Sequence, residues 1–109
     1  MVTSEQIKDI LESVKNLREY LDIDKKLIEI SNEEEKASNP DFWNNSREAE
    51  VLMKILRGKK KWVSDYDQVK SDSEDLSVLY DFFKEGEATE PEVQQQFEKT
   101  IKLLESLEF

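Results

Sequence analysis

Residues 55–83 read ILRGKKKWVSDYDQVKSDSEDLSVLYDFF, and apolar side chains recur along this stretch at alternating gaps of four and three residues. This is the spacing of a heptad repeat, which places every repeat position on one face of an α-helix. Two polar residues interrupt the series without changing its register. The repeat positions are Ile55, Lys59, Trp62, Tyr66, Val69, Ser73, Leu76, Tyr80 and Phe83. We therefore expect one long helix with a coiled-coil-like apolar seam.

The bounds of this long helix are marked by residues on either side of the repeat. Asn45 and Glu48 form a candidate capping box at its start, and Gly86 is the natural stop at its end. A helix over residues 46–84 would be roughly 58 Å long. Its internal glycine, Gly58, costs about 1 kcal/mol relative to alanine and indicates a close helix crossing.

A first helix is expected over residues 4–21, after a capping box formed by Thr3 and Gln6. The segment DID at 22–24 then interrupts the apolar pattern, and Asp24 is a candidate cap for a second helix that ends before Asn39 and Pro40. A single continuous helix is the alternative. It would keep the seven-residue spacing of Ile7, Val14, Leu21 and Ile28.

The last helix follows a capping box formed by Thr89 and Glu92, with Pro91 in its first turn. Its apolar stripe consists of Val93, Phe97, Ile101, Leu104 and Leu107. No glycine or proline closes it, and acidic residues stand where the helix dipole disfavours them. We expect a piece of a longer helix, and of a longer protein.

The composition of the chain favours long helices around a thin core. Its 109 residues are 39% charged and 37% hydrophobic, with only two glycines and two prolines. A net charge of −10 is also typical of disordered chains, but the apolar residues keep helical register and include five phenylalanines. The short connections at 39–45 and 86–88 make the helices that they join antiparallel neighbours. The predicted fold is all-α, a single domain over residues 1–109 built as an elongated antiparallel bundle of three to four helices.

The residue types needed for most enzyme chemistry are missing. The chain has no histidine and no cysteine, hence no common general base, thiol nucleophile or soft metal ligand. It also has no glycine-rich phosphate loop. The carboxylates at 33–35 and 72–75 are adjacent in sequence, so on a helix they diverge and belong to a solvated face. We expect no catalytic activity, no cofactor, no metal and no small-molecule substrate.

Targeting signals are also missing from the sequence. No apolar run approaches the roughly 20 residues that span a bilayer, and the N-terminus lacks a secretion signal. The absence of cysteine is compatible with a reducing compartment. We expect a cytoplasmic protein that does not contact a membrane.

A basic cluster, KILRGKKKW at residues 54–62, stands out from the acidic chain. Helical rotation brings Lys54, Arg57 and Lys61 to one side, away from the seam. Two interpretations stay open: a phosphate contact, which needs no sequence motif, or a solvated helix back. The pI of about 4.5 argues against nucleic-acid binding by the domain as a whole.

The aromatic residues have two expected roles. Those at helical spacing belong to the core, except Phe82, whose place one step off the seam would make it a docking residue if it is exposed. Phe42 and Trp43 lie in the break SNPDFWNNS at 38–46. Burying them against both helix ends would anchor this tip at about 2–3 kcal/mol per side chain.

The same break carries a family resemblance. The run PDFWN at 40–44, followed by a basic and leucine-rich helix, resembles the N-terminal helical domain of bacterial peptide chain release factor 2, a class I release factor. The stretches at 18–26, 75–83 and 103–109 also look like their counterparts in that family. The resemblance implies a translation termination factor acting on the ribosome at UGA and UAA codons.

For this chain the resemblance implies docking rather than chemistry. The family's Ser-Pro-Phe codon-reading tripeptide and its Gly-Gly-Gln hydrolysis motif are absent and would belong to domains after Phe109. The corresponding domain lies near the ribosomal factor-binding region, which makes rRNA, stalk-base protein and the class II release-factor GTPase candidate partners. Lys54, Arg57 and Lys61 are then the candidate ribosome contacts. The alternative is a stand-alone acidic helical adaptor that binds partners through its heptad surface.

Overall fold

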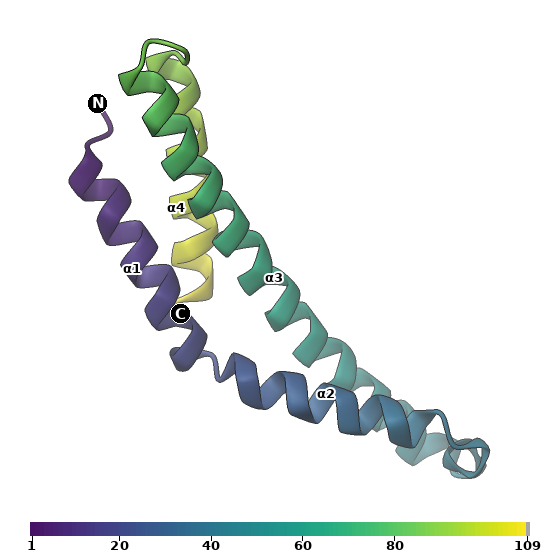
Figure 1. Ribbon diagram of the computed structural model, residues 1–109. Coiled ribbons are helices and arrows are strands. Elements are labelled where there is room, and N and C mark those ends of the chain that lie inside the picture. The colour runs from purple at the N-terminus through teal and green to yellow at the C-terminus, as the bar shows by residue number, and fades with distance from the viewer. Residues whose placement is uncertain (109) are drawn as a thin grey trace.

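The computed structural model describes residues 1–108 and consists of helices joined by short connections (Figure 1). No strand occurs within this range, so the predicted all-α class is confirmed. Phe109, the last residue of the family-like stretch 103–109, lies outside the described residues. The elements are α1 (Ser4–Tyr20), α2 (Ile23–Ala37), the 3₁₀-helix η1 (Pro40–Asn44), α3 (Ser46–Lys84) and α4 (Glu90–Leu107).

Helix α3 is the longest helix and runs along the whole molecule, and its two halves have different neighbours (Figure 1). Helices α1 and α4 run beside its C-terminal half, and α2 runs beside its N-terminal half, all antiparallel to it. The extents are 61 × 22 × 18 Å, with a radius of gyration of 18.6 Å. A compact domain of this length would have a radius of gyration of about 13 Å. The expected elongated bundle is therefore observed, with a three-helix section and a thinner two-helix section.

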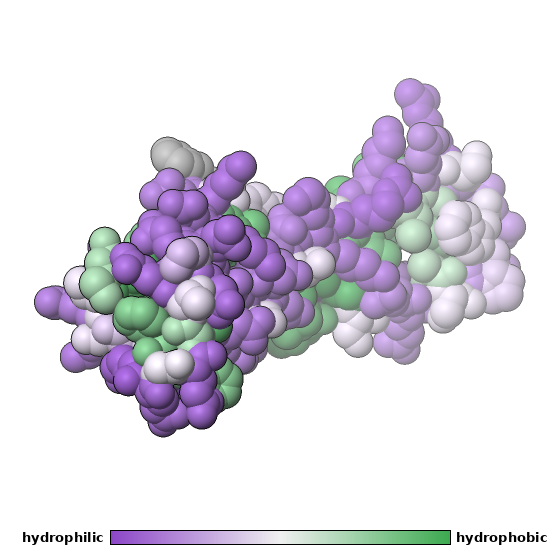
Figure 2. Space-filling model, turned by 90° about the horizontal axis from the view of Figure 1, so that it is seen from above, coloured by the Kyte–Doolittle hydropathy of each residue, from purple (hydrophilic) through white to green (hydrophobic). Residues whose placement is uncertain are grey.

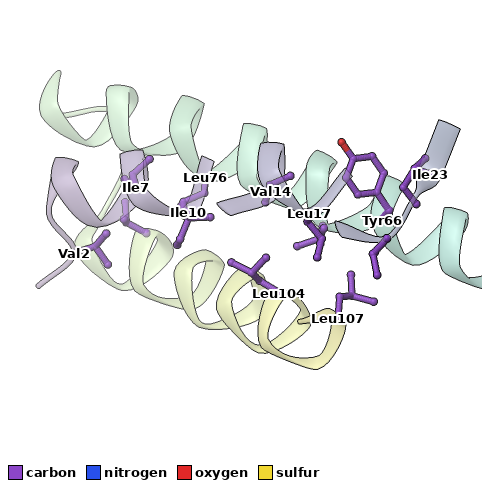
Figure 3. Packing of buried hydrophobic residues seen from close by; sticks show 13 residues of the cluster. Val2, Ile7, Ile10, Val14, Leu17, Ile23, Tyr66, Leu76, Leu104 and Leu107 are labelled. Carbon is purple, nitrogen blue, oxygen red and sulfur yellow. The ribbon is translucent and has the colours of Figure 1, made fainter. Parts of the chain in front are cut away.

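The hydrophobic core fills the three-helix section. Figure 3 shows Leu17 of α1, Tyr66 of α3 and Leu107 of α4 converging close to Ile23, the first residue of α2. The buried cluster consists of Val2, Ile7, Ile10, Val14, Leu17, Leu21, Ile23, Tyr66, Val69, Leu76, Val93, Leu104 and Leu107. The view in Figure 2 shows a mainly hydrophilic surface around this core, with apolar residues in separate patches.

A sharp break separates α1 from α2. Asp22 adopts the left-handed conformation, with φ 50° and ψ 48°, which ends α1 and redirects the chain. The Lys26 ammonium donates a hydrogen bond to the Leu21 carbonyl, which satisfies a group at the end of α1. The predicted break is confirmed, although Asp22 rather than Asp24 precedes α2. The continuous-helix alternative is wrong, and Ile28, its fourth seam residue, is 64% exposed.

The predicted caps explain the other helix bounds. Both capping boxes, at Thr3 and at Thr89, have reciprocal bonds. The Asn45 side chain accepts from the Glu48 amide at 3.2 Å, so the start of α3 has half of its predicted box. Gly86, at φ 81°, ends α3 in a Schellman motif, in which the Gly86 amide donates to Phe83 and the Glu87 amide to Phe82.

Gly58 does not mark a close crossing, and that expectation is wrong. A Cβ built on Gly58 would have no atom within 4 Å. At this level α2 packs against another side of α3, the side that carries Lys59 and Lys60. No helix of the described residues therefore contacts α3 at Gly58 itself. Gly58 therefore lies at an open position on the surface of a long helix.

Candidate functional site

The three candidate contact residues lie together on the N-terminal half of α3. Lys54, Arg57 and Lys61 are all exposed, and helical rotation keeps them within about 60° of one another. Lys54 Nζ lies 3.8 Å from Glu50, and Lys61 Nζ lies 2.6 Å from Asp65. Exposed pairs of this kind contribute about 0–1 kcal/mol, so both cations stay available to a partner.

Arg57 differs from its two neighbours in having no ion pair within residues 1–108. Its guanidinium is the group that suits a phosphate or carboxylate best, because it presents donors in a planar fork. The site is therefore a local group of exposed cations, two of them in weak exposed ion pairs, on a chain whose net charge is −10. Its role as a ribosome contact stays a prediction.

Two other cations of the basic cluster point the opposite way, into the interface with α2. Lys59 Nζ lies 2.5 Å from Glu33 and 3.4 Å from Glu29. Lys60 Nζ lies 2.8 Å from Glu34. The hydrogen bond to Glu33 raises the pKa of Lys59. The sequence analysis did not predict this network. The signal for it was Lys59 itself, because a lysine at a seam position of a helix needs an acidic partner on the neighbouring helix.

The apolar seam of α3 is not covered along its whole length. Tyr66, Val69 and Leu76 are buried, as predicted, but Ile55 is 47% exposed and Trp62 is 38% exposed. The expectation that these last two lie in a covered seam is wrong. Helix α4 ends before it reaches them, and α2 packs instead on Leu56 and its neighbours, about 100° further around α3.

At the tip formed by η1, Phe42 is partly buried and Trp43 is exposed. The Trp43 indole donates a hydrogen bond to the Ala37 carbonyl at 3.2 Å, and its ring meets Phe42 edge-to-face with centroids 5.0 Å apart. Trp43 is nonetheless 53% exposed, so the expected burial of this ring does not occur. The tip is short because Asn39 accepts from the Asp41 amide and starts the 3₁₀ turn. The anchoring role of the two rings stays a prediction.

The remaining aromatic residues divide as the sequence suggested, apart from Trp62. Tyr80, Phe83 and Phe97 are partly buried against the core. Phe82 is exposed and lies on the same helix as the exposed Val78, which satisfies the condition set for a docking residue.

Of the carboxylates expected on a solvated face, Asp72 is buried and Glu33 is partly buried, which corrects that expectation for these two. The Glu33 side chain is enclosed by its contact with Lys59. Asp72 is 2% exposed, and its Oδ1 accepts from Gln68 at 2.9 Å and lies 3.6 Å from Lys99. Its Oδ2 has no partner within the described range. Neither group belongs to a cluster that could hold a metal, as far as residues 1–108 show.

No helix within residues 1–108 is both long enough and apolar enough to cross a membrane.

Comparison with known proteins finds similarity to peptide chain release factor 2 from two bacteria. Peptide chain release factor 2 of Proteus mirabilis (strain HI4320) is 33% identical over 106 residues, which is 95% of this chain and 29% of the relative. Release factor 2 of Petrotoga mobilis (strain DSM 10674 / SJ95) is 22% identical over 103 residues, which is 94% of this chain and 27% of that relative. No protein-family profile matches the chain.

The similarity links this chain to translation termination factors. It runs along almost the whole chain, including the tip at η1 and all of α3. The chain spans less than a third of the length of either relative. The resemblance expected from the sequence is confirmed at this level.

Proposed function

We propose that this chain is the N-terminal helical domain of a bacterial class I release factor, the type that acts at UGA and UAA codons. The observation that carries the proposal is the similarity to release factor 2 over 95% of the chain. The PDFWN run at the η1 tip supports it, since this run is the most specific part of the resemblance.

In this proposal the domain docks the factor on the ribosome and takes no part in chemistry. Its shape suits that role, because a helix of 39 residues reaches far and offers a long exposed side. The exposed cations Lys54, Arg57 and Lys61 supply charge for rRNA or for an acidic protein near the stalk base. The absence of histidine and cysteine supports a domain that is not an enzyme. A contact with the class II release-factor GTPase is the second part of the proposal.

A competition experiment tests the docking role. The 109-residue chain is added in excess to ribosomes that carry a UGA codon and an intact release factor. If both proteins dock at one place, the chain slows peptide release, and it causes no release when it is the sole factor added. An unchanged rate at a large excess of chain would contradict the proposal. The gene offers a second test, since codons for a Gly-Gly-Gln motif should follow the codon for Phe109.

A stand-alone adaptor is the second candidate function, and the exposure of Ile55 and Trp62 favours it. An adaptor that assembles through these residues would form a stable oligomer. Sedimentation equilibrium separates the two candidates, because a domain of a release factor is expected to be a monomer.

A further inference from the structure

One side of α3 carries an apolar stripe that no helix within residues 1–108 packs over, and its side chains are partly exposed. It consists of Val51, Ile55, Gly58 and Trp62, spaced by four, three and four residues. Val51 is 55% exposed, more than the other two side chains of the stripe. Residues at this spacing share one face of a helix, so the three side chains lie in one row. The row has a gap at Gly58, which has no side chain.

The stripe continues a face that is covered further along α3. Trp62, Val69 and Leu76 follow one another at seven-residue steps, and the last two are 0% exposed. The cover there includes α4, because Gln96 and Thr100 both donate hydrogen bonds to the Asp72 carbonyl. Helix α4 ends at Leu107, seven residues beyond Thr100, and therefore reaches about as far as Asp65. Toward the N-terminal end of α3 from that level, no helix of the described range 1–108 lies on this face, and Trp62, Ile55 and Val51 are partly exposed.

The two edges of the stripe differ in charge. The edge toward α2 is closed by Lys59 and its partners Glu29 and Glu33. By helical rotation, Arg47, Lys54 and Lys61 lie beside the other edge, and Arg57 lies further around the helix. Lys54 and Lys61 have exposed ion pairs with Glu50 and Asp65, so this edge keeps an excess of positive charge. The charge that would complement this second edge is negative.

We propose that the stripe is the docking seat of an amphipathic α-helix that has an apolar seam and an acidic flank. Phosphates of an RNA would need only the cations, whereas the heptad spacing of Val51, Ile55 and Trp62 matches the seam of a second helix. The open position at Gly58 lets the backbone of that helix come close. The inference deepens the docking function proposed above, on which it rests for its biological setting, by naming the chemistry of the partner.

Intrinsic fluorescence tests the seat directly. The chain has two tryptophans, so Trp43→Phe leaves Trp62 as the sole reporter. The probe is a synthetic peptide of about four heptads with leucine in its seam and glutamate on its flanks, and the control peptide has lysine on its flanks. The acidic peptide is expected to move the Trp62 emission to shorter wavelength with a saturable dependence on concentration. The lysine peptide is expected to leave the emission unchanged.

Substitutions in the stripe separate docking from folding. Ile55→Ser is expected to weaken binding about tenfold or more, since it removes an apolar anchor. Ile28→Ser makes the same change at an exposed position of α2 and is expected to have no effect. Gly58→Gln fills the gap in the stripe and is expected to weaken binding about tenfold, although glutamine is the better helix former.

Several outcomes would overturn the inference. One is equal binding of the acidic peptide and the lysine peptide. A second is the absence of a saturable shift of the Trp62 emission up to about 1 mM acidic peptide. A third is a uridine oligoribonucleotide that binds at Trp62 more tightly than the acidic peptide does. Binding of the chain to ribosomes is measured in a separate experiment, so that the inference and the proposed function can fail independently. A chain that binds ribosomes but not the acidic peptide loses this inference and keeps the proposed function. A chain that binds the acidic peptide but not ribosomes loses the proposed function alone.

Discussion

The ammonium of Lys59 on α3 lies 2.5 Å from the carboxylate of Glu33 on α2. This contact lies in the two-helix section, where, of the α-helices within residues 1–108, only α2 and α3 are present. Glu29, one turn before Glu33, provides a second carboxylate at 3.4 Å. An ion-pair network thus occupies a seam position that would hold an apolar side chain in a regular coiled coil.

The Lys59 network predicts a loss of stability at alkaline pH. Its hydrogen bond to Glu33 raises the pKa of Lys59 in the folded state. A raised pKa stabilises the fold below the unfolded value of about 10.4 and loses this effect as pH rises through the folded value. The melting temperature should therefore fall more between pH 9 and pH 12 in the wild type than in Lys59→Met. Equal falls would show that Lys59 contributes no such effect.

The left-handed backbone at Asp22 predicts an order of stability among substitutions. A residue with a β-carbon loses about 1–2 kcal/mol in this conformation, least for Asp and Asn and most for β-branched side chains. Urea denaturation should place Asp22→Gly and Asp22→Asn at or above the wild type. Asp22→Val should unfold at lower urea, at a cost of about 1–2 kcal/mol. A valine variant as stable as the wild type would contradict the αL conformation.

The buried carboxylate of Asp72 predicts that an apolar replacement stabilises the fold. One of its oxygens lacks a partner within the described residues, and a buried polar group left without a hydrogen bond costs about 1–3 kcal/mol. Its ion-pair partner Lys99 is exposed and can be solvated by water when the carboxylate is removed. Asp72→Leu should raise the free energy of unfolding by about 1–2 kcal/mol, while Asp67→Leu on the exposed side should change it little. Lys99→Met should destabilise more than Lys102→Met, since Lys99 alone of these two lies near Asp72. A less stable Asp72→Leu variant would contradict this account.

Local signals in the sequence were sufficient for most of the helix bounds. The boxes at Thr3 and Thr89 and the glycine at position 86 act within one turn of the chain, so they can be read without knowing the tertiary structure. The heptad repeat likewise predicted α3 over residues 55–83, and the signals at Asn45 and Gly86 predicted its ends. The burial of its individual positions depends on how far neighbouring helices extend, which no local pattern contains. For this reason the repeat predicts Trp62 in the core, whereas its side chain is 38% exposed.

Only part of the candidate site could be predicted, because local patterns do not contain the position of neighbouring helices. Helical rotation alone groups Lys54, Arg57 and Lys61 on one side. The divergence of Lys59 and Lys60 toward α2 depends on the position of Glu33 and Glu34 across a helix interface. The burial of Asp72 depends on packing of α4 against α3, and a run of acids in the sequence gives no sign of it.

Binding of the 109-residue chain to purified bacterial ribosomes, measured across a range of salt concentrations, tests the central claim most directly. The wild type is expected to bind, with an affinity that falls as salt rises. Reversal of Lys54, Arg57 and Lys61 to glutamate should reduce the salt slope by about two to three and weaken binding at least tenfold. Reversal of the exposed Lys8, Lys25 and Lys102 changes the net charge equally and should have a much smaller effect. A wild-type chain that does not bind ribosomes, or equal effects of the two triple variants, would contradict the account.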